Sequence, residues 1–312
     1  MSPSPVGPLA RGTPARDALD GAVTAIGAAG CETPRLDAEL LLADTLGISR
    51  ERLYVACMPT SAARGVRSGA SSASGNGRQD EDELVVAGAS VRTFQDFVRR
   101  RSVLREPVAY ILGKRHFRGL ELASDSRALI PRPETELLVE VALTLPEGRR
   151  VLDVGTGSGA VALALKDERP DLEVAGSDLS ADALALARAN SERLGLDVRW
   201  LTADLLEGVP DEFDAVLSNP PYVPDRDRAM LAPEILRHEP SRALFAGEDG
   251  LDAIRPLLSQ AAGRTSVRLL ALEVGAGQAA VVSELMRAAG FPSVRTERDL
   301  AGIERVVVGE RA

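Results

Sequence analysis

The sequence lacks most of the features that mark secreted, membrane-spanning and metal-binding proteins. Its only cysteines are Cys31 and Cys57 and its only histidines are His116 and His238, with no CxxC pair and no histidine cluster. A disulfide framework and a metal site are therefore disfavoured, and a reducing compartment is expected. No apolar run approaches the length of a membrane span, and the proline-rich stretch 1–8 contains no signal-peptide core. We therefore expect a cytoplasmic protein.

An excess of positive charge is also lacking. The 312 residues carry a net charge of −9 and the isoelectric point is about 5.0, so the overall charge does not attract nucleic acid. A local basic band runs from Arg92 to Arg118, with Asp96 and Glu106 as its acids. It could dock an acidic or RNA-bearing partner, although we favour a solvated helix face. The remaining composition, 45% hydrophobic and 27% charged, is that of a globular protein with room for two domains.

The N-terminal part of the chain predicts a small helical bundle. Residues 1–16 are expected to be disordered, and apolar residues at helical spacing over 17–106 predict several helices. One helix should begin after Thr33, another after Ser49, and a third should run from Leu84 to about Arg105. Serine, alanine and glycine dominate residues 61–77, so we interpret 61–83 as a flexible insertion in this bundle.

Two short strand-like runs, 107–113 and 116–122, predict a β-hairpin linker over residues 107–125. The run Leu129-Ile-Pro-Arg-Pro-Glu-Thr-Glu136 follows, and its two prolines should hold Arg132 in an extended backbone. A helix is expected over 134–145. The residues by themselves indicate only a linker followed by a helix with an acid-rich N-terminus.

From residue 149 onward, strands and helices alternate, which predicts an α/β domain with a mostly parallel sheet over 126–312. Serine at position 180 should cap one helix, and glycine at position 195 should end it. The expected strands are 149–154, 173–177, 197–201, 213–218, 267–273 and 303–308, and the other expected helices are 160–168 and 279–289.

A glycine-rich turn, Gly155-Thr156-Gly157-Ser158-Gly159, joins the first of these strands to its helix. Its glycines allow a tight turn and a close approach of the backbone to a ligand. Asp178 lies 23 positions after Gly155 (178 − 155), which suits an acid that binds a ribose. Because Ala160 can replace a third glycine, a nicotinamide dinucleotide remains an alternative. Asp153 before the turn and Asp204 after the third strand favour S-adenosylmethionine, since methyltransferases use acids at these places.

The strand over 213–218 ends in Asn219-Pro220-Pro221-Tyr222. The prolines have no N–H for a sheet ladder, so the strand must stop here, at the edge where parallel sheets bind ligands. The side-chain carbonyl of Asn219 and the backbone carbonyl of Pro220 could accept both hydrogens of a planar –NH2 group. Tyr222 could lie flat on an amide or a base. A proline-terminated strand with a capping asparagine remains the alternative for this motif alone.

Taken together, these motifs resemble those of the HemK/PrmC-type release-factor glutamine methyltransferases. The resemblance implies a class I S-adenosylmethionine-dependent methyltransferase fold with a Rossmann-like, mostly parallel seven-stranded sheet. It also implies that the helical region 17–106 recognises the substrate. It covers nearly the whole chain from Thr33 onward and rests on Thr33–Leu42, Pro107–Gly113, Leu129–Glu136, Asp153–Ala160, Asn219–Tyr222, Glu239–Gly250 and Gly302–Val306.

The activity that this resemblance implies is methylation of the N5 atom of the glutamine in the Gly-Gly-Gln motif of bacterial class 1 peptide chain release factors. S-adenosylmethionine would be the donor and S-adenosylhomocysteine the product, with no metal, no membrane and no direct nucleic-acid partner. The catalytic residues would be Asn219, Pro220 and Tyr222. The donor would contact Asp153, Gly155, Thr156, Gly157, Ser158, Gly159, Asp178, Asp204, Leu205 and Asn219. The substrate would contact Asn219, Pro220, Pro221, Tyr222, Arg132 and Phe117.

Other functions stay open on the sequence. Glutamine methylation of a ribosomal protein would use the same chemistry. Methylation of adenine N6 in nucleic acid also targets an –NH2 group, but the acidic isoelectric point and the small helical region disfavour it. A non-catalytic S-adenosylmethionine-binding or translation-associated module would not need Asn219 and Tyr222. An NAD oxidoreductase would need a hydride-site acid–base pair, and none is evident.

Overall fold

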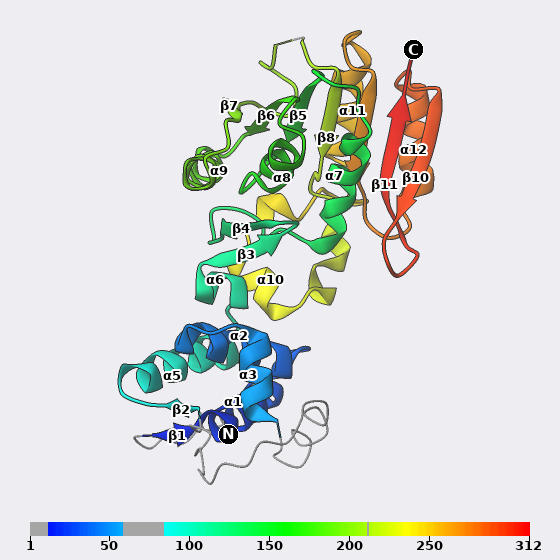
Figure 1. Cartoon of the computed structure of the whole chain (residues 1–312). Helices are drawn as coiled ribbons and strands as arrows, with labels where there is room; N and C mark the ends of the chain where they lie inside the picture. Colours follow the sequence, from blue (N-terminus) through cyan, green and yellow to red (C-terminus); the bar gives the residue numbers. More distant parts are fainter. Residues whose placement is uncertain (1–11, 59–83, 211) are drawn as a thin grey trace, which may run out of the picture. The chain divides into compact units, whose positions relative to one another are not determined.

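The computed structural model describes residues 12–58, 84–210 and 212–312, and it divides the chain into two compact units, Met1–Leu112 and Gly113–Ala312 (Figure 1). Residues 1–11 of the predicted disordered terminus and the whole of the predicted insertion over 61–83 lie outside the described residues. Within the described ranges, no helix is both long enough and apolar enough to cross a membrane.

The first unit is a helical bundle with one short β-ladder. Its core gathers buried side chains from every long helix of the unit, among them Leu19, Leu41 and Phe94. In its described part the helices are α1 (Ala15–Ala28), α2 (Pro34–Leu46), α3 (Arg50–Cys57), α5 (Ala89–Ser102) and α6 (Val108–Leu112), and the strands are β1 (Thr13–Pro14) and β2 (Val85–Val86).

Local signals set the starts of α2 and α3 as the sequence predicts. Helix α2 begins at Pro34 after Thr33, and α3 begins after Ser49, whose side-chain oxygen accepts a hydrogen bond from the backbone N–H of Arg52. A buried ion pair joins α2 to α5, with 2.6 Å between Arg101 Nε and Asp37 Oδ2. Both cysteines lie in the described part of the chain, where they are buried and form no disulfide bond.

Two of the boundaries predicted for the bundle are wrong. Residues 13–16 are ordered, because β1 pairs with β2 and α1 begins at Ala15. The helix predicted from Leu84 begins only at Ala89. The β-branched pair Val85–Val86 forms the ladder with β1 instead, and the backbone N–H of Ala15 donates to Leu84 O at 2.7 Å. Gly88, with a φ of 58°, separates strand from helix.

The strand predicted over 107–113 is also wrong, since this stretch forms helix α6. The carbonyl of Pro107 accepts hydrogen bonds from the N–H groups of Tyr110 and Ile111, each at 3.0 Å, which closes a helical turn. Both side chains are buried. The predicted hairpin is therefore shorter than expected and consists of β3 (Lys114–Phe117) and β4 (Leu120–Ala123), which pair antiparallel in the second unit.

A seven-stranded sheet forms the centre of the second unit in the described residues, in the order β10-β11-β9-β8-β5-β6-β7. The strands from β9 to β7 in this order run parallel, and β11 and β10 are antiparallel additions at one edge. The strands are β5 (Arg150–Val154), β6 (Glu173–Asp178), β7 (Arg199–Thr202), β8 (Ala215–Ser218), β9 (Leu269–Glu273), β10 (Ser293–Arg298) and β11 (Glu304–Glu310).

Helices cover both faces of this sheet (Figure 1). Val151 and Leu217 lie in one apolar cluster with α7 and α8, whereas their chain neighbours Leu152 and Val216 lie in a second cluster with α11 and α12. This alternation is what the twofold period of a strand requires when both faces are buried. The helices are α7 (Glu136–Leu143), α8 (Ala160–Glu168), α9 (Ala181–Leu194), α10 (Pro233–His238), α11 (Ile254–Ala262) and α12 (Ala279–Ala288), with 3-10 turns η1 (Pro133–Thr135), η2 (Asp225–Met230) and η3 (Ser241–Ala243).

Candidate active site

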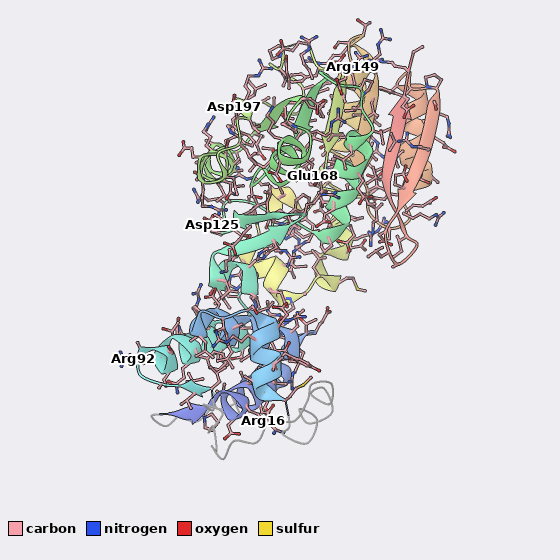
Figure 2. The ribbon with its side chains drawn as sticks, viewed as in Figure 1. Arg16, Arg92, Asp125, Arg149, Glu168 and Asp197 are labelled. Carbon is pink, nitrogen blue, oxygen red and sulfur yellow. The ribbon has the colours of Figure 1, made fainter. Side chains whose placement is uncertain are left out.

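A cavity of about 540 Å³ lies at the carboxyl ends of the parallel strands, a volume typical of small-molecule sites. The opposite end of β5 is marked by Arg149 near the top of Figure 2, where Arg149 Nη1 pairs with Asp214 Oδ1 at 2.9 Å. The loop 127–132 and residues after β5, β6, β7 and β8 line the cavity. The expected site residues among its lining are Arg132, Asp153, Gly155, Thr156, Gly157, Ser158, Asp178, Asp204, Leu205, Asn219 and Pro221.

The glycine turn after β5 is built on left-handed backbone conformations. Gly155, Gly157 and Gly159 have φ values of 69°, 57° and 83°, which side chains other than glycine rarely adopt. The backbone N–H of Gly157 donates to Asp178 Oδ2 at 3.0 Å, and that of Ser180 donates to Asp178 Oδ1 at 2.8 Å. The turn and the end of β6 are therefore tied together through one carboxylate that lines the cavity.

Asp153 is buried at the floor of this turn. Its Oδ2 accepts a hydrogen bond from Thr156 Oγ1 at 2.6 Å. Burial raises the pKa of Asp153 from its ordinary value of 3.8 to about 7, opposed by the hydrogen bonds from Thr156 and Ala162 and assisted by the charge of Asp178. Two carboxyl groups, those of Asp153 and Asp178, therefore line one cavity and suit a ligand that carries positive charge.

Asn219 stands at the end of β8 within a chain of hydrogen bonds. Its Nδ2 donates to Thr135 Oγ1 at 3.1 Å, and Thr135 Oγ1 donates to Glu273 Oε2 at 2.6 Å. The hydroxyl of Tyr222 donates to the other oxygen, Glu273 Oε1, at 3.2 Å. Three segments far apart in the sequence thus converge behind Asn219: η1, the loop after β8 and the end of β9.

Glu273 is 1% exposed, and burial raises its pKa from 4.5 to about 7. The hydrogen bonds from Thr135 and Tyr222 act against this shift, as does the charge of Arg305, whereas Glu134 adds to it. The pKa of the Tyr222 hydroxyl is raised by its burial and by the carboxylate of Glu273. The sequence reasoning missed Thr135 and Glu273. An acid that closes the otherwise apolar strand Leu269–Glu273 was a signal that could have indicated the second.

Tyr222 is held at both of its ends. Besides its hydroxyl contact, its backbone carbonyl accepts a hydrogen bond from Gln278 Nε2 at 3.0 Å. A Cβ atom at Gly250 would lie only 2.2 Å from that carbonyl, so the chain needs glycine there. Tyr222 therefore fixes the loop that carries Asn219.

The cavity lining does not include Gly159, Pro220, Tyr222 or Phe117. Gly159 packs against Trp200, since a Cβ atom there would lie 2.9 Å from the indole ring. Phe117 is 1% exposed and lies in the apolar cluster of the sheet. The ligand contacts expected of these residues remain predictions. Arg132 lines the cavity and pairs through Nη2 with Glu239 Oε1 at 2.5 Å.

The sheet order, the glycine turn after β5 and the Asn-Pro-Pro-Tyr segment after β8 define a methyltransferase. Residues 133–248 match the family model of the methyltransferase small domain, and residues 17–61 match that of the PrmC N-terminal domain. The solved catalytic domain of hMettl16 in complex with the MAT2A 3′UTR hairpin 6 is similar with a TM-score of 0.50 over 74% of this chain and 86% of that one. At 15% identity this similarity shows the fold alone.

Curated relatives narrow the class to one family. The release factor glutamine methyltransferase of Deinococcus radiodurans is 40% identical over 95% of this chain and 98% of its own length. The protein of the same name from Rhodospirillum rubrum is 38% identical over 94% of this chain and 84% of its own length. The chain belongs to the release factor glutamine methyltransferase family. The fold class and the family that the sequence motifs predicted are therefore confirmed.

Proposed function

We propose that the protein transfers a methyl group from S-adenosylmethionine to N5 of the glutamine in the Gly-Gly-Gln motif of bacterial class 1 peptide chain release factors. The names of its relatives and the family that they define support this substrate. The cytoplasm, where translation ends, is the compartment that the proposal requires.

The cavity fits the proposed donor. S-adenosylmethionine supplies an electrophilic methyl group on a positively charged sulfonium, and Asp153 and Asp178 give the cavity two carboxyl groups. Asp178 is oriented by the N–H groups of Gly157 and Ser180, so its remaining lone pairs can accept from ribose hydroxyls. Asp204 and Leu205, which follow β7, line the same cavity and would border the adenine.

The position and hydrogen bonding of Asn219 support a glutamine amide as the target. It lines the cavity, its Nδ2 donates to Thr135, and no donor to its Oδ1 occurs among the described residues. That oxygen can therefore accept one N–H of a target amide, and the carbonyl of Pro220 can accept the other. With both N–H bonds held, the lone pair of the amide nitrogen would face the incoming methyl group.

Positioning is the main contribution that these residues can make. An amide nitrogen is a weak nucleophile because its lone pair is conjugated with the carbonyl. Oriented reactants gain up to about 7–11 kcal/mol over free ones, and this gain requires no general base before methyl transfer. The extra proton of the product can leave to water afterwards.

The first experiment combines the purified protein, S-adenosylmethionine and an unmodified release factor, with peptide mass spectrometry of the Gly-Gly-Gln segment. One added methyl group on the glutamine is the expected result. Asn219→Ala should lose nearly all turnover, while calorimetry shows donor binding weakened only moderately. Donor binding without methylation of the release factor by the wild-type protein would contradict the substrate, and absence of donor binding would contradict the reaction.

Recognition of the rest of the release factor is the role we propose for the helical unit. The match of residues 17–61 to the PrmC N-terminal domain supports this assignment. The intact release factor should then have a kcat/KM at least tenfold higher than a short peptide that contains the same Gly-Gly-Gln sequence. Equal values for the two substrates would contradict it.

A further inference from the structure

We propose that Thr135 and Glu273 are positioning residues that hold the Asn219 amide with Oδ1 toward the target, and that they thereby select an amide over a carboxylate. This inference rests on the proposed function, because it concerns the specificity of the same site. It follows from the number of hydrogen-bond donors that the side chains of Glu273, Thr135 and Asn219 can supply to one another.

A carboxylate can only accept hydrogen bonds, whereas a threonine hydroxyl has a single proton to donate. Both oxygens of Glu273 are occupied, one by the hydroxyl of Tyr222 and the other by that of Thr135. The proton of Thr135 is therefore committed to Glu273. Toward Asn219, Thr135 Oγ1 can only accept, and the group of Asn219 that can donate to it is Nδ2. A flipped amide would place Oδ1 against an oxygen with no hydrogen between them.

This orientation decides what the cavity can receive next to Asn219. With Nδ2 turned to Thr135, Asn219 offers an acceptor to the target, and the Pro220 carbonyl is a second acceptor. A glutamine amide has two N–H donors for these two oxygens. A glutamate carboxylate has none and would meet two oxygen atoms, an arrangement that costs affinity because polar groups stay unpaired. Thr135 and Glu273 therefore act on the choice of target without touching it.

The charge state of Glu273 controls this arrangement. The groups that face its carboxyl are Thr135 from η1 and Tyr222 from the loop after β8, with Glu134 and Arg305 acting through their charges. Protonation would convert one oxygen of Glu273 into a donor, so Thr135 or Tyr222 would lose its acceptor. Since its pKa is about 7, the fixed orientation of Asn219 should be present at pH 8 and lost progressively toward pH 6.

The decisive pair of variants is Thr135→Val and Thr135→Ser. Thr135→Val keeps the shape but removes the hydroxyl, so kcat with the release factor should fall about ten- to a hundredfold. The donor dissociation constant should change less than about threefold. Thr135→Ser restores the hydroxyl and should recover most of kcat. Thr144→Val is the matched control, because the Thr144 hydroxyl donates to Val141 O at the C-terminal end of α7, and Thr144 does not line the cavity.

The selectivity for glutamine over glutamate is a measurement that would not change if Thr135 had only a structural role. A release factor whose motif reads Gly-Gly-Glu serves as a competitive inhibitor, and its inhibition constant is compared with the KM of the Gly-Gly-Gln form. The ratio of these constants should fall about tenfold in Thr135→Val, because Asn219 is then free to turn Nδ2 toward a carboxylate. Wild-type kcat together with wild-type selectivity in Thr135→Val would overturn the proposal.

Two further measurements do not depend on the folding of that variant. Wild-type kcat should decline below about pH 7, and Glu273→Gln should lack this decline. In the wild-type protein, the ratio of the Gly-Gly-Glu inhibition constant to the Gly-Gly-Gln KM should also fall as the pH is lowered from 8 to 6. A ratio that is constant with pH, or an unchanged decline in Glu273→Gln, would overturn the proposal. Failure of the wild-type protein to methylate the release factor would instead count against the proposed function.

Discussion

Arg132 and Glu239 form an ion pair, with 2.5 Å between Nη2 and Oε1, although 107 positions separate them in the sequence. The two side chains differ in burial, since that of Glu239 is 1% exposed and that of Arg132 is 30% exposed. Glu239 Oε2 also accepts from the N–H of Ile130 at 3.1 Å. The pair therefore ties the loop before η1 to the segment around η3, and both segments line the cavity.

This difference in burial predicts an asymmetric response to mutation. Arg132→Met should leave the Glu239 carboxylate buried without its counter-ion and lower the free energy of unfolding by about 3 kcal/mol. Glu239→Gln leaves a guanidinium that is 30% exposed and that water can solvate, so the loss of unfolding free energy should be about 1 kcal/mol. Urea denaturation followed by tryptophan fluorescence measures both values. Equal losses, or a larger loss in Glu239→Gln, would contradict this assignment of the roles.

Tyr222→Phe should shift the pH dependence of turnover upward. The Tyr222 hydroxyl stabilises the ionised form of Glu273 through its hydrogen bond, so its removal should raise the pKa of Glu273 further above 7. The pH at which kcat falls to half should then rise by about one unit, given the usual strength of a hydrogen bond to a charged group. A steady-state pH profile of both proteins measures the shift. An unchanged or lower midpoint would mean that Glu273 does not control this limb.

The elements that the sequence predicted well are those whose ends have local causes. Helix α8 runs from Ala160 to Glu168 as expected, because the glycine turn fixes its start. Ser180 and Gly195 bound α9 through a side-chain cap and a left-handed residue. Strand β10 was not predicted, since Ser293–Arg298 is polar and partly exposed and owes its conformation to pairing with β11. Helix α6 was mistaken for a strand because a short apolar run has no distinctive period.

The candidate site likewise contains residues that the sequence indicated and residues that only the structure showed. The glycine turn, Asp178 and Asn219 were recognisable because each stands at a strand end that the sequence itself marks. Thr135 and Glu273 were not, because their roles depend on a contact across 138 positions of the chain. Spacing in the sequence gives no information on which buried carboxylate a given hydroxyl will meet. The position of Asn219 at the cavity could thus be predicted, but the hydrogen-bond chain from Asn219 through Thr135 to Glu273 required the fold.

Gly176→Ala should be strongly destabilising, because the indole of Trp200 in β7 packs directly against the backbone of β6 at Gly176. A Cβ atom at Gly176 would lie 2.4 Å from Trp200 Cζ3 and 2.8 Å from Thr156 Oγ1. Overpacking of this kind costs about 1–3 kcal/mol. Gly119→Ala in the turn of the β3–β4 hairpin is the matched control, since a Cβ atom there meets nothing within 4 Å. Trp200 is the only tryptophan, so a change in its emission maximum in Gly176→Ala alone would report the displaced ring.

Asp153 should make stability and donor affinity respond to pH in opposite directions. Its pKa is about 7 in the folded protein and near 3.8 in the unfolded chain, so the folded state binds this proton more tightly. Its contribution to stability is therefore complete below about pH 4 and is lost as the pH rises through 7. The ionised form, in contrast, should attract a cationic donor, so the donor dissociation constant should fall between pH 6 and pH 8.

Asp153→Asn, which removes the titrating group, isolates both effects. Because Glu273 titrates in both proteins, its contribution cancels in the difference between their unfolding free energies. That difference should move in favour of Asp153→Asn as the pH rises from 5 to 8. Donor binding by the variant should be weaker than that of the wild type at pH 8 and should lose the pH dependence that Asp153 confers. Urea denaturation and calorimetry at four pH values measure the two trends. A difference that stays constant between pH 5 and pH 8 would contradict this prediction, because it would mean that the buried carboxyl is ionised throughout this range, with a counter-charge supplied inside the fold.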